Sequence, residues 1–132
     1  MTPYKIITLL KNTSSTNAKR EILKEHRSDL DFNRVLTQIF DPRITFGIKK
    51  IPKYEYIAED LTLNEAIDEL GLLERRMHTG KNATALLQGI LETVSEEDAQ
   101  VIKWIIAKDC KAGFGESLIN DEMFPFQVYE VP

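Results

Sequence analysis

The chain has 132 residues, 42% of them hydrophobic and 29% charged, which is typical of one globular domain that buries its own core. A single cysteine excludes an intramolecular disulfide, and no apolar run approaches the roughly 20 residues of a membrane span, so we expect a cytoplasmic protein without a membrane partner. The net charge of −4 argues against a generic nucleic-acid binder, although residues 1–57 carry +5 and residues 58–132 carry −9, which permits a basic face on an acidic protein.

Three amphipathic helices are expected before the first proline break in the chain. Thr2 is a suitable N-cap for the first helix, and Pro3 suits its first helical position. The second helix follows the serine and threonine caps at 14–16, and the third ends at Asp41-Pro42. Spacings of three and one between apolar residues are typical of a helix with a broad buried stripe. In the second and third helices the expected core residues are Ala18, Ile22, Leu23, Phe32, Val35, Leu36, Ile39 and Phe40.

Residues 43–61 have a different character, because apolar alternation is weak and lysines cluster. We expect an irregular connection there, with at most a short strand or helical turn. The next helix begins with a capping box formed by Thr62 and Glu65. Its apolar stripe extends to Met77, with Gly71 inside the helix.

A TGKN stretch breaks the chain again, and we expect Asn82 to cap the helix that follows. Ser95 caps another helix, which has acidic residues in its first turn and runs to about Asp109. One more short helix follows. The sequence therefore predicts an all-α protein, a compact bundle of about six or seven helices in residues 1–124, with the start of a linker at 125–132.

No catalytic constellation emerges from the residue types that carry chemistry. The two histidines, His26 and His78, lack a second ligand at metal-binding spacing. A phosphate loop of the G-x-x-x-x-G-K-[ST] type and a dinucleotide fingerprint are both missing from the sequence. We therefore expect no catalytic residue, metal or cofactor within these residues, and we expect Cys110 to be a structural thiol.

Three loops combine glycine with lysine. GIKKIPK carries Lys49 and Lys50 where the backbone is irregular, and MHTGKNA places Lys81 just before a helix. KDCKAGFGES follows the most apolar helix and holds two glycines within three residues. Helix N-termini present free N–H groups and a partial positive charge, so phosphate binds there. Taken singly, each loop is better explained as an ordinary solvated turn, but the three could also converge on one face.

These stretches, in this order, resemble the N-terminal DNA-binding domain of ATP-dependent DNA ligases, and within that family the T-even bacteriophage type. The resemblance rests on STNAKREIL, RVLTQIF, GIKKIPK, TGKNATALLQGIL and VIKWIIAKDCKAGFGESLIN, which run nearly end to end through the chain. It implies an all-α domain that clamps the minor-groove side of nicked double-stranded DNA through loop lysines and backbone amides. Such contacts carry little base identity, so binding would be independent of sequence.

The resemblance also implies which loop residues touch DNA. Lysines would neutralise phosphates, glycines would allow close backbone approach, and one asparagine and one serine would hydrogen-bond phosphate or sugar. Phe114 stands where cellular members often have a cationic residue, and Glu116 would repel a phosphate at the start of the last helix. The expected contacts are Lys49, Lys50, Lys81, Asn82, Lys111, Gly113, Gly115 and Ser117.

The family's adenylation motif, lysine-x-aspartate-glycine, does not occur in the chain, so the catalytic lysine would lie beyond Pro132. The resemblance therefore implies a monomeric, non-catalytic domain of a larger enzyme that uses ATP and Mg to seal nicks in replication, repair and recombination, within the host cytoplasm if phage-encoded. A stand-alone homologue is the other interpretation. Two further functions stay open: an acidic module that docks a replication partner such as a sliding clamp, and a small phage protein with an enzymatic role of its own.

Overall fold

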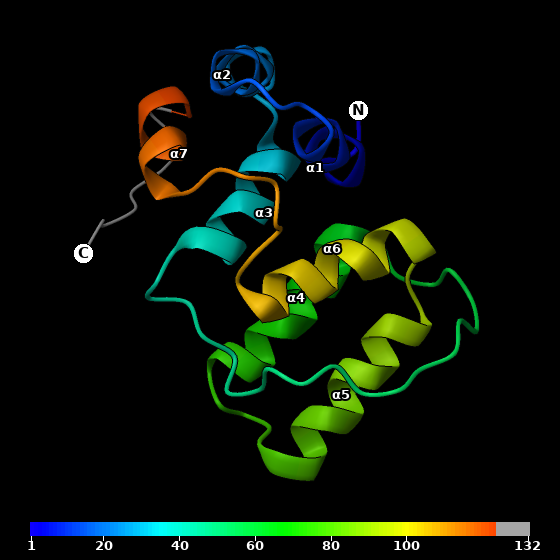
Figure 1. Cartoon of the computed structure of the whole chain (residues 1–132). Helices are drawn as coiled ribbons and strands as arrows, with labels where there is room; N and C mark the ends of the chain where they lie inside the picture. The colour runs from blue at the N-terminus through cyan, green and yellow to red at the C-terminus, as the bar shows by residue number, and fades with distance from the viewer. Residues whose placement is uncertain (124–132) are drawn as a thin grey trace. The chain divides into compact units, whose positions relative to one another are not determined.

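The computed structural model describes residues 1–123 apart from the Glu116 side chain, so the expected linker at 125–132 lies outside the described residues. The described residues form seven helices and no strand, which confirms the all-α class (Figure 1). The chain divides into two compact units, which we call the terminal unit (Met1–Pro42 with Lys108–Pro132) and the central unit (Arg43–Ala107). The terminal unit contains α1 (Pro3–Lys11), α2 (Thr16–Glu25), α3 (Leu30–Phe40) and α7 (Glu116–Glu122), and the central unit contains α4 (Leu63–Glu74), α5 (Gly80–Glu92) and α6 (Glu96–Ala107).

Side-chain caps fix where the helices of the terminal unit begin. Thr2 accepts a hydrogen bond from the Lys5 N–H at 3.3 Å, with Pro3 at the first helical position as predicted. Ser15 begins α2 in the same way. α1 packs against α2 and α3, and α7 packs against α2 (Figure 1). The fully enclosed side chains of this unit include Ile6, Ile7, Leu10, Leu23, Phe32, Val35, Ile119 and Met123.

α7 is attached to α2 by both apolar burial and charge. Ile119 and Met123 are fully buried, and enclosing a side chain of this size stabilises a fold by about 1.5–3 kcal/mol. Glu122 is also buried, and its Oε1 accepts a hydrogen bond from Arg20 Nη1 at 2.9 Å. Arg27 Nε donates to the Glu122 carbonyl oxygen at 2.6 Å. A seven-residue helix is too short to be stable alone, so these contacts hold it in place.

The central unit is a three-helix cluster with the irregular segment 43–61 laid against it. The predicted capping box of Thr62 and Glu65 is present at the start of α4. The irregular segment satisfies part of its backbone at the end of α5, where the Ile57 N–H donates to the Glu92 carbonyl oxygen at 2.9 Å. None of the described helices is long and apolar enough to cross a bilayer. The core of the unit includes Ala66, Leu70, Leu73, Leu87, Leu91, Val94, Val101, Ile102 and Ile105.

Two predicted helix limits in the central unit are wrong. α4 ends at Glu74, and Met77 lies beyond it with 65% of its surface exposed, because Arg76 adopts a left-handed φ of 56° that takes the chain out of the helix. α5 begins at Gly80 with Thr79 as its N-cap, so Asn82 lies inside the first turn instead of capping it. The connection between α4 and α5 therefore spans residues 75–79, about three residues earlier than the sequence pattern indicates.

Candidate nucleic-acid interface

Arg76, which follows α4, holds together the two glycine-lysine loops of the central unit. Its Nη1 donates to the Thr45 carbonyl oxygen at 3.1 Å, and its Nη2 donates to Thr45 Oγ1 at 3.0 Å. Nη1 also donates at 2.9 Å to the Leu73 carbonyl oxygen at the end of α4, which accepts from the Arg76 backbone N–H as well. Gly47 lies beside this guanidinium with a φ of +72°, and a Cβ there would lie 3.1 Å from Arg76 Cζ. The start of the GIKKIPK loop is thereby tied to the segment that leads into α5.

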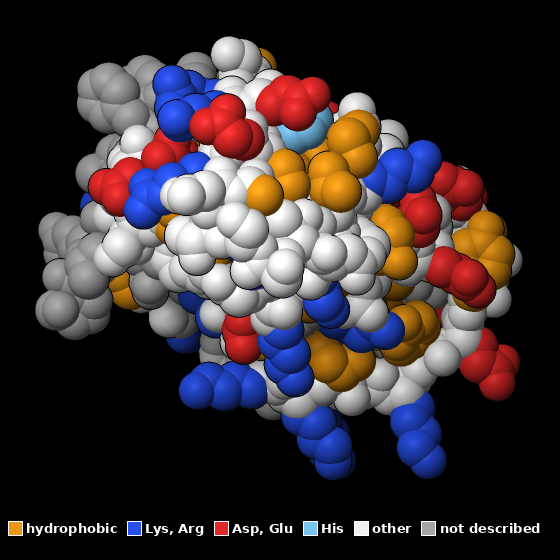
Figure 2. Space-filling view, turned by 45° about the horizontal axis from the view of Figure 1, so that its top comes forward, with side chains coloured by type: hydrophobic (Ala, Val, Ile, Leu, Met, Phe, Trp, Pro, Cys, Tyr) orange, Lys and Arg blue, Asp and Glu red, His pale blue; other side chains and the backbone are white. Residues whose placement is uncertain are grey.

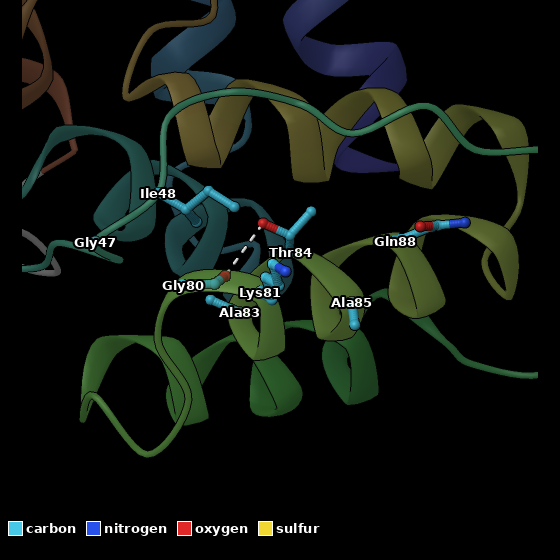
Figure 3. A pocket seen from close by; sticks show the side chains of 8 residues that line it. All are labelled: Gly47, Ile48, Gly80, Lys81, Ala83, Thr84, Ala85 and Gln88. Atoms are coloured by element: carbon cyan, nitrogen blue, oxygen red, sulfur yellow. Dashed lines mark hydrogen bonds between the residues drawn. The ribbon is translucent and has the colours of Figure 1, made fainter.

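An open groove of about 600 Å³ lies where these loops meet the first turns of α5 (Figure 3). Gly47 and Ile48 line the groove from the irregular segment, and Gly80 and Lys81 line it from α5. Thr84 Oγ1 donates to the Gly80 carbonyl oxygen at 3.2 Å, which closes the first turn of the helix. The structure therefore brings together two of the three loops singled out in the sequence. The remaining lining residues are Ala83, Ala85 and Gln88.

The start of α5 offers backbone N–H groups at this groove. Thr79 makes no side-chain capping hydrogen bond, and Gly80 follows it with a φ of 57°. The first turn of a helix leaves N–H groups without intrahelical partners and carries about half a positive charge. Lys81 and Asn82 are both exposed in this turn. A phosphate oxygen is the ligand that such a helix start favours.

Charge is sharply segregated along the central unit. Residues 43–54 and 75–84, which we call the basic segments, hold seven Lys and Arg and no Asp or Glu. The rest of the unit holds 11 Asp and Glu, with Lys103 as its one basic residue. Lys49 and Lys50 are exposed, and on the face drawn in Figure 2 several Lys and Arg side chains extend into solvent. The groove is therefore bordered by a concentration of positive charge within an acidic unit, which attracts a polyanion.

The third loop, residues 108–115, belongs to the terminal unit. Lys111 is exposed and has a φ of 53°, and its N–H donates to Asp109 Oδ1 at 2.8 Å. Ser117 is exposed in the first turn of α7. Lys111 in the loop and Ser117 in the helix that follows it, both predicted to contact DNA with their side chains, are therefore accessible to a ligand.

The two glycines of this loop differ in what surrounds them. Gly115 is the extended N-cap of α7, and a Cβ there would point into open space. Gly113 has a φ of +76°, and a Cβ there would lie 2.5 Å from Lys19 Nζ. Phe114 packs on Phe40 with ring centroids 5.6 Å apart. The glycine at 113 is therefore required by its conformation and by Lys19, whereas Gly115 leaves room for another molecule.

Cys110 is buried, and its thiol is poorly suited to act as a nucleophile. Burial raises the pKa of the Cys110 thiol to about 11, because desolvation disfavours the thiolate. Within residues 1–123, no three His, Cys, Asp or Glu side chains gather so as to hold a metal ion.

The curated relatives of this chain are DNA ligases. The DNA ligase of Enterobacteria phage T4 is 26% identical over an alignment of 133 residues, which covers 97% of this chain and 27% of that ligase. The DNA ligase of Enterobacteria phage T6 matches with the same identity and coverage. The resemblance to T-even phage DNA ligases predicted from the sequence is thereby confirmed, and the chain spans about a quarter of the length of these relatives.

Two solved structures share the fold of this chain. The structure named Pmar-Lig_PreS3 superposes with a TM-score of 0.88 at 24% identity, covering 100% of this chain and 32% of that chain. The structure named Pmar-Lig_Pre. superposes with a TM-score of 0.85 at 25% identity, covering 98% of this chain and 31% of that chain. No family model matches the sequence.

Proposed function

We propose that this chain binds nicked double-stranded DNA without reading its sequence, as the N-terminal domain of an ATP-dependent DNA ligase. The parent enzyme would join 3′-hydroxyl and 5′-phosphate ends through an adenylated lysine, with ATP and Mg bound outside these residues. The domain would hold the duplex near that catalytic core. The observation that carries the proposal is the similarity to phage DNA ligases along 97% of the chain.

The geometry of the central unit supports this function independently of the similarity. A duplex presents phosphates at regular spacing, and a surface that binds it needs cations and amide N–H groups more than base-reading side chains. The basic segments supply exposed Lys49, Lys50 and Lys81. At the start of α5 the Asn82 and Ala83 N–H groups donate to the Thr79 carbonyl oxygen, which leaves the N–H groups of Gly80 and Lys81 for a ligand. Sequence-independent binding is the expected result.

Each proposed contact has a chemical role on one of the loops. The exposed lysines at 49, 50, 81 and 111 would neutralise phosphates. The side chains of Asn82 and Ser117 would hydrogen-bond phosphate or sugar oxygens. The glycines at 113 and 115 would let the backbone of the terminal unit approach the duplex. The assigned contacts are Lys49, Lys50, Lys81, Asn82, Lys111, Gly113, Gly115 and Ser117.

The test is a titration of fluorescently labelled nicked duplex with the chain at low salt, repeated over a salt series. We expect binding whose logarithm falls linearly with the logarithm of salt, with a slope of about −0.9 for each phosphate neutralised. The double substitution Lys49→Glu and Lys50→Glu should weaken binding to all duplex sequences alike. It should also reduce the magnitude of the salt slope by about two. Absence of binding by the wild-type chain at low salt would refute the proposal, and an unchanged slope in the variant would remove that loop from the contacts.

A further inference from the structure

Lys19 on α2 is a buried cation that the proposed contacts do not include. Only 8% of its surface is exposed. Its Nζ donates to the Ala112 carbonyl oxygen at 2.6 Å and to the Gly113 carbonyl oxygen at 3.4 Å. Taking an ammonium group out of water is costly unless hydrogen bonds compensate it, and both of these bonds go to the backbone of the third loop. The hydrogen bonds of the Lys19 ammonium therefore stabilise the backbone of the third loop.

The contact between Lys19 and the loop constrains the loop most strongly at Gly113. Gly113 has a φ of +76°, and a Cβ at that position would lie 2.5 Å from Lys19 Nζ, so the ammonium occupies the space that any other residue would fill. Lys111 also has a left-handed φ of 53°. A left-handed φ suits the glycine at 113 but costs free energy at Lys111, and the Lys19 bonds to the adjacent backbone help to offset that cost.

Holding the carbonyl oxygens also decides where the neighbouring N–H groups point. In a planar trans peptide the C=O and the following N–H point in opposite directions. Because the Ala112 and Gly113 oxygens face Lys19, the N–H groups of Gly113 and Phe114 face away from it. Among the hydrogen bonds of the described residues, none uses these two N–H groups. They are two adjacent donors available to an acceptor outside the unit.

We propose that Lys19 is a positioning residue for DNA binding, which acts without touching DNA by holding the Ala112–Gly113 backbone so that the N–H groups of Gly113 and Phe114 face a phosphate. This inference rests on the proposed function, since it assigns the N–H groups to the same duplex. Lys111, exposed on the same loop, supplies charge beside them.

The test compares Lys19→Met with a control that removes the same charge from the same helix. Lys24→Met is that control, because the Lys24 side chain is 48% exposed and its ion pairs lead to Glu21 and Glu122 instead of the loop. Affinity for nicked duplex is measured over a salt series at a temperature where circular dichroism reports each variant folded. We expect Lys19→Met to bind roughly tenfold more weakly, as for the loss of one charge-assisted contact, with its salt slope unchanged. Lys24→Met should bind within about twofold of the wild type.

The salt slope separates positioning from direct contact. A slope reduced by about 0.9 in Lys19→Met would mean that Lys19 itself neutralises a phosphate, and this would overturn the positioning role. Unchanged affinity in the folded variant would mean that the contact serves stability alone, and it would overturn the inference while leaving the proposed function intact. If the wild-type chain does not bind, the proposed function fails and the inference fails with it.

Two further measurements keep the inference testable if Lys19→Met does not fold. Gly113→Ala attacks the same contact from the loop side, and we expect the same loss of affinity with an unchanged salt slope. In ¹H–¹⁵N NMR spectra of the wild type, titration with nicked duplex should shift the Gly113 and Phe114 amide signals more than those of α1. Amide signals at 113 and 114 that stay in place while the duplex binds would refute the proposal.

Discussion

Several long cationic side chains of this protein bind backbone carbonyls instead of extending into solvent. Lys108 Nζ donates to the Gln38 carbonyl oxygen at 2.8 Å and to the Asp41 carbonyl oxygen at 2.7 Å, at the end of α3. Lys19 and Arg76 do the same for a loop and for the end of α4. Carbonyls at helix ends lack intrahelical donors and carry partial negative charge, so a cation there is stabilising. A count of 17 Lys and Arg therefore overstates the charge that is free to meet DNA.

The buried thiol of Cys110 makes the protein less stable as the pH becomes alkaline. Burial raises the pKa of Cys110 from 9.0 to about 11, so the unfolded chain ionises at lower pH than the folded one. The corresponding stability is complete below pH 9 and is lost as the pH rises toward 11. In urea titrations, we expect the free energy of unfolding to fall over this range by about 2 kcal/mol more in the wild type than in Cys110→Ala. Parallel pH profiles for the two proteins would contradict this assignment.

At the scale of single elements, the helix α5 and the loop that faces it use glycine in opposite ways. Gly89 lies inside α5 with open space where a Cβ would point, so Gly89→Ala should raise the free energy of unfolding by about 0.5–1 kcal/mol. Gly47 has a left-handed φ and lies against the Arg76 guanidinium, so Gly47→Ala should lower it by about 1–2 kcal/mol. Urea unfolding of both variants gives the two values. A stabilising effect at 47 would mean that the loop does not need its left-handed turn.

The starts of α1 and α4 could be predicted from the sequence because their capping chemistry is local. Thr2 and the Thr62–Glu65 capping box bind N–H groups only three residues away, so the residues that form the sequence pattern are also the residues that make the hydrogen bonds. The end of α4 and the start of α5 were predicted wrongly because neighbouring residues compete there. Thr79 precedes Asn82 and caps first, although its hydroxyl forms no capping bond.

The candidate site shows the same division between local and distant interactions. The loops that carry Lys49 and Lys81 could be found from glycine, lysine and helix-start patterns. Arg76 was missed because its partner Thr45 is 31 residues away. Lys19 was missed because an apolar stripe has no place for lysine, yet its position four residues before Leu23 puts both on one face of α2. A polar residue on a buried helix face can therefore indicate a hydrogen bond to a distant loop, as Lys19 does.

At the scale of the whole molecule, a net charge of −4 conceals a strongly uneven distribution. In the central unit, the basic segments border the groove at the start of α5. Acidic residues fill the rest of the unit, including the first turn of α6. Attraction between a duplex and an acidic protein is possible because charges farther apart than about 8–10 Å are largely screened at moderate salt. The location of the cations therefore matters more for binding than their sum.

Two charge reversals within the central unit test whether DNA binding depends on where a cation lies or on the net charge of the protein. Lys81 borders the groove, whereas Lys103 lies over the Tyr54 ring, 5.2 Å from its centroid, in a pocket with Leu91 at the other end of α5. Ten residues of helix separate Lys81 from Leu91, which is about 15 Å and beyond the screening length. We expect Lys81→Glu to weaken binding of nicked duplex about tenfold and to reduce the salt slope by about 0.9, with Lys103→Glu changing affinity less than about threefold and leaving the slope unchanged. Both variants lower the net charge by the same amount, so equal losses of affinity would mean that total charge governs binding and that the groove is not the contact surface.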